Sequence, residues 1–401
     1  ELPEVAASAS LSPMPAATKD QLVAAWKRGL AAQIKESGAL PPGNAKGAPA
    51  AWAKPNTGAA AAARRALSSP RTGSSSGDVE AEAVAAWRAA PAAERRRAAK
   101  AALEADASDA EAAFALYEAE DELGDGDAAV AALRAALAAD PSHAAAARLL
   151  AAAEGGADAA SAAANDAAGA AEYARQIFDG YATTFDEHLT GTLKYSVPKE
   201  LALAADAASG GGRSGVDPPR YACIVDAGCG TGLSVEPFAG RADSVIGIDV
   251  SSKMLEVARG KGLYSTLLCD DLVSGLATLA QGQCDLIISA DTLMYVGRLD
   301  GFFEQAERVL ASGGVLAFSV ESAERATSQG DAGSVALGED GIGLQPSGRF
   351  CHTRGYVEGL AARSGDGDGG AWETAAEPRD VMGRMDGDKP VYATLHVFVR
   401  R

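Results

Sequence analysis

Short apolar runs alternate with stretches of helical character over the second half of the chain. The apolar runs lie at 222–225, 244–248, 264–268, 284–289 and 313–320, and a last, alternating run lies at 391–399. The helical stretches lie between them at 233–240, 251–260, 298–311 and 352–363. Strands that alternate with helices are typical of a parallel sheet covered on both faces. We therefore predict an α/β fold, with a doubly wound, mostly parallel sheet of seven strands that ends in an antiparallel strand.

A different pattern precedes this region, in the alanine-rich residues 78–155. The string Ala102-Leu-Glu-Ala-Asp-Ala-Ser108 returns as Ala136-Leu-Ala-Ala-Asp-Pro-Ser142. The offset between the two copies is the period of tetratricopeptide repeats, which this segment resembles, although any alanine-rich helical hairpin gives similar matches. One or two units are fewer than a free-standing solenoid needs, so we expect the segment to pack on a neighbour or bind a protein partner.

The remaining segments complete the predicted organisation. Residues 1–77 are of low complexity and are predicted to be disordered, apart from an amphipathic stretch from Lys19 to Leu40. Residues 156–170 have the composition of a linker, and the α/β domain is predicted to span 171–401.

Charge narrows the classes of partner. The chain has 401 residues and a net charge of −18, of which residues 78–401 contribute −23. An acidic body repels phosphate backbones, so a small-molecule or protein partner is favoured over nucleic acid.

The cysteines and the hydropathy of the chain indicate the cellular compartment in which we expect the protein. The five cysteines form no CxxC pair, which disfavours a metal site and fits reduced, buried thiols. No apolar run is long enough to span a membrane. We expect a cytoplasmic protein, or an organellar one if residues 1–77 are a transit segment.

A glycine-rich turn follows the first strand of the α/β region. Residues 225–232 read Val-Asp-Ala-Gly-Cys-Gly-Thr-Gly, with an acid, Asp226, at the strand end. Gly228, Gly230 and Gly232 permit a sharp turn and a close ligand, and a helix is expected to follow. A second acid, Asp249, ends the next strand, where a carboxylate can accept both hydroxyls of a ribose.

The Asp-x-Gly-x-Gly-x-Gly spacing resembles motif I of the class I S-adenosylmethionine-dependent methyltransferases. The resemblance implies S-adenosyl-L-methionine as the cofactor, with Asp226 near its ammonium group through water and Asp249 on its ribose. Met254 would lie against the adenine, although a methionine in a helix is more often plain core.

The ends of the third and fourth strands extend the resemblance. It implies that Asp271, or else Asp270, meets the adenine amino group, with the backbone N–H of Leu272 on the ring. One of these acids can instead cap a helix. The run Ala290-Asp-Thr-Leu-Met-Tyr295 resembles motif IV, which passes between cofactor and acceptor.

Two further segments narrow the resemblance to predicted methyltransferases that carry tetratricopeptide repeats. They are Tyr173-Ala-Arg-Gln-Ile-Phe-Asp-Gly-Tyr181 with the residues up to 198, and Leu344-Gln-Pro-Ser-Gly-Arg-Phe-Cys-His352. The resemblance covers about residues 100–401. It implies that 173–195 covers the cofactor, with Tyr173, Tyr181 or Tyr195 near it, unless these rings only pack the lid.

The same resemblance implies a function. The protein would transfer a methyl group to a small molecule or a protein side chain by in-line displacement, with Asp291 or His352 as the candidate base. For His352, a structural hydrogen bond is the favoured interpretation. The absence of Asn/Asp-Pro-Pro-Tyr after the fourth strand weakens the case for amino methylation of nucleobases or glutamine. The alternatives are an NAD(P)-dependent oxidoreductase and a non-catalytic repeat scaffold with a cofactor-sensing domain.

Overall fold

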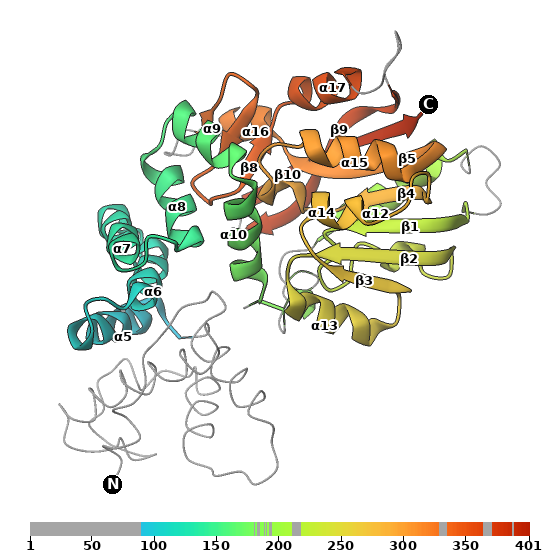
Figure 1. Cartoon of the computed structure of the whole chain (residues 1–401). Coiled ribbons are helices and arrows are strands. Elements are labelled where there is room, and N and C mark those ends of the chain that lie inside the picture. The colour runs from blue at the N-terminus through green and yellow to red at the C-terminus, as the bar shows by residue number, and fades with distance from the viewer. Residues whose placement is uncertain are drawn as a thin grey trace, which may run out of the picture. The chain divides into compact units, whose positions relative to one another are not determined.

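The computed structural model describes residues 90–179, 181–182, 185–187, 189, 191, 195–210, 218–328, 335–363, 371–386 and 389–401. The chain divides into two compact units, Glu1–Leu150 and Ala151–Arg401, which are described separately (Figure 1). The predictions made for residues 1–77, including the helix from Lys19 to Leu40, lie outside the described residues.

Helices that repeat with the period of the sequence make up the described part of the first unit. They are α5 (Ala92–Ala105), α6 (Ala110–Glu122), α7 (Gly126–Ala139) and α8 (Ala144–Glu154), which runs into the second unit. Both bounds of α7 follow those of α5 by the same offset that separates the two copies of the sequence string, and α8 begins at that offset from α6.

The turns between these helices repeat as well. The Ser108 amide donates to Asp106 Oδ1 over 3.0 Å, and the Ser142 amide donates to Asp140 Oδ1 over 2.9 Å. The helical segment is therefore a structural repeat, while its assignment to the tetratricopeptide family stays a prediction.

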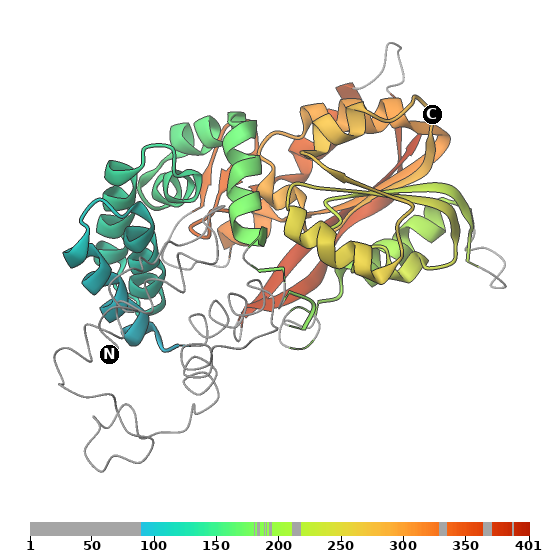
Figure 2. The same ribbon diagram turned by 60° about the horizontal axis from the view of Figure 1, so that its bottom comes forward.

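A seven-stranded sheet forms the centre of the second unit (Figures 1 and 2). Its strands are β1 (Tyr221–Ala227), β2 (Ala242–Asp249), β3 (Thr266–Cys269), β4 (Cys284–Ser289), β5 (Leu310–Glu321), β9 (Trp372–Asp386) and β10 (Lys389–Arg400). The spatial order is β3-β2-β1-β4-β5-β10-β9, with β10 antiparallel to both of its neighbours. The predicted doubly wound, mostly parallel sheet is confirmed.

Helices cover both faces of this sheet because its strands are apolar on both sides. Val225 and Ile287 belong to one buried core with α14 (Leu272–Ala277), α15 (Asp300–Val309) and α17 (Arg354–Arg363). Ile224 and Ile288 belong to a second core with α12 (Val197–Ala208) and the 3₁₀ helix η3 (Glu236–Phe238). α13 (Ser252–Lys261) follows β2, as the sequence predicted.

The segment after the glycine turn differs from the prediction. The helix expected at 233–240 is reduced to the three residues of η3. An α-helix through this segment would need the amide of Pro237 to bond the carbonyl of Leu233, and proline has no N–H and clashes there. Gly240, with a φ of 71°, then turns the chain into β2.

The segment 156–170 is helical instead of being the linker that was predicted. It contains α9 (Ala157–Asn165) and the start of α10 (Ala167–Asp179). Ala160 and Ala164 are buried in the core of the second unit, so their small side chains serve close packing.

Several further elements were not predicted. A small sheet consists of β6 (Ala336–Leu337), β7 (Ile342–Leu344) and β8 (Phe350–His352), and short helices lie at α11 (Phe185–Glu187) and α16 (Ala323–Ser328). A 3₁₀ turn, η4 (Leu293–Tyr295), follows β4. Within the described ranges, no helix has the length and apolar character that crossing a membrane requires.

Candidate active site

A cavity of about 220 Å³ opens at the carboxyl ends of β1, β2 and β4. β1 has β2 on one side and β4 on the other, so the chain reverses direction across the sheet at this point. Ligands of doubly wound sheets bind in the crevice at such a switch point. The turn after β1, the ends of β2 and β4, the starts of α13 and α14, and α10 all contribute to the wall.

The three glycines of the turn share a backbone conformation that favours glycine, but their surroundings differ. All three have positive φ, at 80° for Gly228, 51° for Gly230 and 94° for Gly232. A Cβ on Gly228 would lie 2.1 Å from the Thr292 side chain, and one on Gly232 would lie 3.0 Å from Tyr264. A Cβ on Gly230 would meet no atom within 4 Å, although this residue lines the cavity. Its backbone therefore faces open space. Gly228 lines the same cavity, whereas Gly232 does not.

Asp249 is held in the cavity wall by two backbone amides. Its Oδ2 accepts from the Gly230 N–H and its Oδ1 from the Ser251 N–H, each over 2.8 Å. The residue is 9% exposed, and burial raises the pKa of its carboxyl to about 6. Each oxygen keeps a lone pair for a further donor. The site thus presents an oriented carboxylate suited to a pair of hydroxyls.

Asp226 does not itself line the cavity, and its approach to a ligand ammonium group through water stays a prediction. Its Oδ2 accepts from Ser234 Oγ and Tyr264 Oη, each over 2.6 Å, and Ser234 is the member of this group that lines the cavity. Within the described chain, Asp226 Oδ1 is buried with no hydrogen-bond partner. Burial raises the pKa of this carboxyl to about 6.

At one end of the cavity, apolar side chains lie beside one carboxylate. Met254, which is 1% exposed, and Leu272 line it together with Asp271. Asp270 does not line it. Asp271 Oδ1 accepts from the amides of Val273 and Ser274 over 3.0 Å, so this acid also caps α14.

Alanines make up most of the wall that α10 contributes. Ala170, Ala174 and Phe178, spaced one turn apart, line the cavity. Tyr173 and Tyr181 do not, contrary to prediction: the Tyr173 hydroxyl donates to the Ser347 carbonyl over 3.1 Å, and the Tyr181 ring packs edge-on against Phe185. Beyond α10, aromatic rings continue the wall.

Three rings complete that part of the wall: Phe185, Tyr195 and Tyr295. Of the three tyrosines considered from the sequence, only Tyr195 is at the cavity. On α10 itself, Ala174 faces the cavity and the neighbouring Tyr173 does not.

Asp291, directly after β4, reaches the cavity from a strained backbone conformation. Its φ is 50°, which is uncommon for a residue with a Cβ, and such strain clusters at functional sites. Its amide donates to Ser319 Oγ over 2.8 Å, and Ser319 Oγ donates to its Oδ1 over 3.0 Å. Arg384 of β9 pairs with its Oδ2 over 3.1 Å. Burial raises the pKa of Asp291, and Arg384 opposes that rise.

Arg384 joins Asp291 to a second buried acid. It pairs with Glu321 over 2.5 Å, and Arg349 pairs with Glu321 over 2.9 Å. Although burial pushes the pKa of Glu321 up, Arg349 and Arg384 hold it below its usual range. The two acids and two arginines form a charge-balanced network behind the cavity, and no sequence signal linked β9 to Asp291.

His352 is not part of the cavity, which corrects its prediction as a candidate base. It is 1% exposed on β8, its Nε2 lies 2.8 Å from the Gly297 carbonyl oxygen, and its ring stacks on Tyr356. Burial lowers the pKa of this imidazole to about 4. These contacts favour the structural interpretation of His352 over that of a base.

Sequence comparison places this site within a known domain. The model of the methyltransferase domain family matches residues 225–318, which include the glycine turn, Asp249, Asp271 and Asp291. The chain contains a class I S-adenosylmethionine-dependent methyltransferase domain. The seven-stranded sheet is the core of this methyltransferase domain.

Individual relatives are similar to a part of this chain. A ubiquinone biosynthesis O-methyltransferase of Chelativorans sp. (strain BNC1) is 37% identical over 95 residues, which is 23% of this chain and 38% of the relative. A demethylmenaquinone methyltransferase of Tropheryma whipplei (strain Twist) is 33% identical over 93 residues, 23% of this chain and 39% of the relative. The matches span about two fifths of these curated relatives.

Among solved structures, the N-methyltransferase NodS from Bradyrhizobium japonicum WM9 resembles this chain with a TM-score of 0.35 and 16% sequence identity. The likeness covers 51% of this chain and 93% of that chain.

Proposed function

We propose that this protein transfers a methyl group from S-adenosylmethionine to a small-molecule acceptor by in-line displacement. The observation that carries the proposal is one cavity that holds an oriented carboxylate, Asp249, an open backbone at Gly230, and a strained carboxylate, Asp291. The first two suit a nucleoside and the third suits an acceptor.

The residues in the cavity fit the cofactor. Asp249 would accept the two ribose hydroxyls, because both of its oxygens are oriented by backbone amides. Asp271 would accept from the adenine amino group beside Met254 and the Leu272 amide. Ser234, supported by Asp226, would reach the amino-acid portion of the cofactor beyond Gly230.

When bound, S-adenosylmethionine supplies a methyl group that its sulfonium already activates. The chain's own task is then to hold the acceptor in line and keep water out, and such positioning can supply several kcal/mol. The alanines of α10 and the rings of Phe185, Tyr195 and Tyr295 are suited to excluding water.

Asp291 is the candidate base. Ser319 and Arg384 both donate to its carboxylate, which favours the ionised form against the effect of burial. An ionised Asp291 can accept the proton of a hydroxyl or amine as the methyl bond forms. Because several similar proteins are O-methyltransferases, acceptors with a hydroxyl or carboxyl oxygen are the first choice.

The turn itself argues against a nicotinamide dinucleotide. Dinucleotide enzymes place a pyrophosphate at the amino end of an α-helix that follows the glycine turn. Here three 3₁₀ residues, Glu236–Phe238, follow the turn, so that anion site is not formed. The oxidoreductase alternative is therefore not favoured.

Calorimetric titration of the full chain with S-adenosylhomocysteine tests cofactor binding. Asp249→Ala removes two charge-assisted hydrogen bonds and is expected to weaken binding at least about 100-fold. Asp243→Ala, an exposed acid near the amino end of the same strand and outside the cavity, is the matched control and should bind like the wild type. NAD(H) binding without S-adenosylhomocysteine binding would overturn the proposal.

Transfer of labelled methyl from S-adenosylmethionine tests turnover. Oxygen acceptors are assayed first, then nitrogen and sulfur acceptors, and finally a cell extract separated by molecular mass. Asp291→Asn should reduce transfer by about 100-fold or more while S-adenosylhomocysteine affinity stays within about twofold. Label that appears only in macromolecules would replace the small-molecule acceptor by a protein, and no transfer at all would contradict the enzymatic role.

A further inference from the structure

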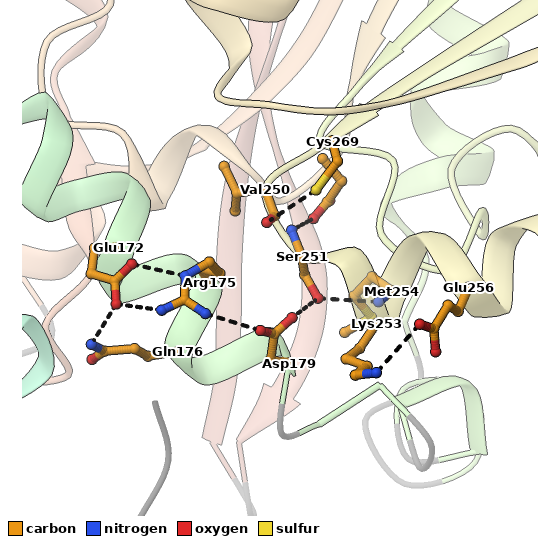
Figure 3. Close-up of polar contacts among 11 residues, drawn as sticks. Glu172, Arg175, Gln176, Asp179, Val250, Ser251, Lys253, Met254, Glu256 and Cys269 are labelled. Carbon is orange, nitrogen blue, oxygen red and sulfur yellow. Dashed lines mark hydrogen bonds and ion pairs between the residues drawn. The ribbon is translucent and has the colours of Figure 1, made fainter. Parts of the chain in front are cut away.

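Ser251 connects the ribose carboxylate to α10 (Figure 3). Its amide donates to Asp249 Oδ1 over 2.8 Å, while its hydroxyl donates to Asp179 Oδ1 over 2.7 Å. The same hydroxyl oxygen accepts from the Met254 amide over 3.1 Å, and so caps α13. Ser251 thus has its backbone on one carboxylate and its side chain on another.

Asp179 is itself held in place by its own helix (Figure 3). Arg175, one turn earlier on α10, pairs with it over 3.2 Å and pairs with Glu172 through two nitrogens, at 2.8 and 2.5 Å. The side chains of Arg175 and Asp179 are 28% and 20% exposed, so the pair is partly shielded from water. A carboxylate fixed in this way makes a more specific contact than a freely rotating one.

The contact between α10 and the start of α13 brings two acids near each other. Asp179 lies near enough to Asp249 that its charge contributes to raising the pKa of that carboxyl. Two acids in proximity cost electrostatic energy, which Arg175 offsets. An uncharged residue would dock α10 without this cost, so the pairing indicates a more specific task than docking.

α10 also supplies part of the wall around the cofactor. Ala170, Ala174 and Phe178 precede Asp179 on α10 and line the cavity, and Asp249 lines it from the end of β2. The Asp179–Ser251 hydrogen bond therefore joins two sides of one cavity directly beside the ribose carboxylate.

We propose that Asp179 is a positioning residue for the cofactor: through Ser251 it fixes the α10 wall and the Asp249 carboxylate relative to each other around the ribose. The proposal rests on the proposed function of the cavity, because it needs a nucleoside there. It assigns a role to a residue that the glycine turn and the strand ends do not reveal.

The first test is calorimetric titration of the full chain with S-adenosylhomocysteine. Asp179→Ala is expected to weaken binding about tenfold or more, and Asp179→Asn to recover part of the loss because its amide oxygen can still accept from Ser251. Glu256→Ala is the matched control. Glu256 pairs with Lys253 on the exposed side of α13, in the same region (Figure 3), and its loss should leave affinity within about twofold.

A double-mutant cycle asks whether Asp179 acts through Ser251. Ser251→Ala alone removes both the contact with Asp179 and the cap of α13. In that background Asp179→Ala should cost little further affinity, because its partner is already missing. If the affinity loss of the double mutant equals the product of the two single losses, Asp179 does not act through Ser251.

A ribose-specific readout separates positioning from general support of the fold. Adenosine and 2′-deoxyadenosine compete with S-adenosylhomocysteine, and their affinity ratio reports the value of one ribose hydroxyl. If Asp179 positions Asp249, the ratio falls toward one in Asp179→Ala. A purely structural role would lower both affinities and leave the ratio unchanged.

The outcomes distinguish this inference from the proposed function. Failure of the wild type to bind S-adenosylhomocysteine would remove the function itself. Tight wild-type binding with an unchanged adenosine ratio in Asp179→Ala would overturn the inference alone. Should Asp179→Ala fail to fold, the ratio is measured in Ser251→Ala, which removes the same hydrogen bond and keeps the Ser251 amide on Asp249, and an unchanged ratio there would overturn the inference as well.

Discussion

Gly230 and Gly240 have similar backbone conformations but different surroundings. Their φ angles are 51° and 71°, and a Cβ on either would meet no atom within 4 Å. Gly230 lines the candidate cofactor cavity and Gly240 does not. Alanine at either position should cost about 1–2 kcal/mol of unfolding free energy, because both require positive φ.

Only Gly230→Ala should also weaken S-adenosylhomocysteine binding, by about tenfold or more, since its methyl group enters the space of the ligand. Thermal unfolding and calorimetric titration of both variants provide the comparison. Equal loss of affinity in Gly240→Ala would assign the effect to backbone strain instead of ligand contact.

Asp226 gives a prediction about pH. Its pKa lies at about 6 against an ordinary 3.8, because burial disfavours the carboxylate. The native state therefore holds this proton more tightly than the unfolded state, so the contribution of Asp226 to stability is greatest at low pH and is lost as pH rises through about 6. Asparagine has no ionisable carboxyl, so Asp226→Asn should remove this loss of stability at high pH.

At pH 8 the variant should be more stable than the wild type by up to about 3 kcal/mol, and the gain should shrink as pH falls to about 4. Urea unfolding at both pH values measures it. A gain independent of pH would mean that the Asp226 charge is not its source.

The site residues differ in how far the sequence could locate them. Asp249, Asp271 and Asp291 each lie at or just beyond the end of a strand, so the sheet alone carries them to the edge where the cavity lies. Tyr173 depends on the rotation of a helix about its axis, which packing decides. Arg384 contacts Asp291 across 93 positions of sequence, and no local pattern encodes such a contact.

At the scale of elements, α10 is expected to require small side chains where it faces the cavity. Ala174 lines the cavity and is 8% exposed, whereas Ala168 is exposed on the same helix. Ala174→Leu should reduce S-adenosylhomocysteine affinity about tenfold or more by filling ligand space, while Ala168→Leu should leave it unchanged. Leucine is a good helix former at both positions, so helix propensity does not explain a difference. Equal affinities in the two variants would place the ligand away from α10.

Four of the predicted strands share one property. β1, β2, β4 and β5 are paired on both sides, and their apolar runs stand out from the surrounding sequence. β9 pairs only with β10, at the sheet edge, and carries Glu377, Pro378, Arg379 and Asp380 in its middle. Charged residues and proline are typical of edge strands and conceal them from hydropathy. For α9 the composition was misleading for another reason. Its alanine-rich sequence predicted a linker, but Ala160 and Ala164 are core residues.

For the whole molecule, the mostly parallel sheet followed from the alternation of elements, and the helical repeat followed from the offset between two sequence strings, which the helix bounds reproduce. The repeat can be recognised in the sequence because an Asp-x-Ser turn recurs in it, at Asp106 and at Asp140. A binding partner of the repeat could not be predicted in the same way, because binding depends on surface residues and these do not recur with the repeat.

Net charge yields the prediction that belongs to the whole chain. Residues 78–401 carry a net charge of −23, and this region contains residues 225–318, which match the methyltransferase domain family. Binding to a nucleic acid gains most of its free energy from lysine and arginine contacts that release counterions from phosphates, and an excess of acids opposes it. The full chain should therefore bind a fluorescent single-stranded RNA more weakly than about 100 µM at physiological salt, as measured by anisotropy.

Lowering the salt concentration should not rescue this binding, because repulsion between like charges grows as screening weakens. Residues 1–77 have a net charge of +5, so they are the part of the chain whose charge favours RNA binding. Repeating the titration after their removal separates the two contributions. Affinity near about 1 µM that persists without residues 1–77 would reveal a local basic surface and would reopen RNA as a methyl acceptor.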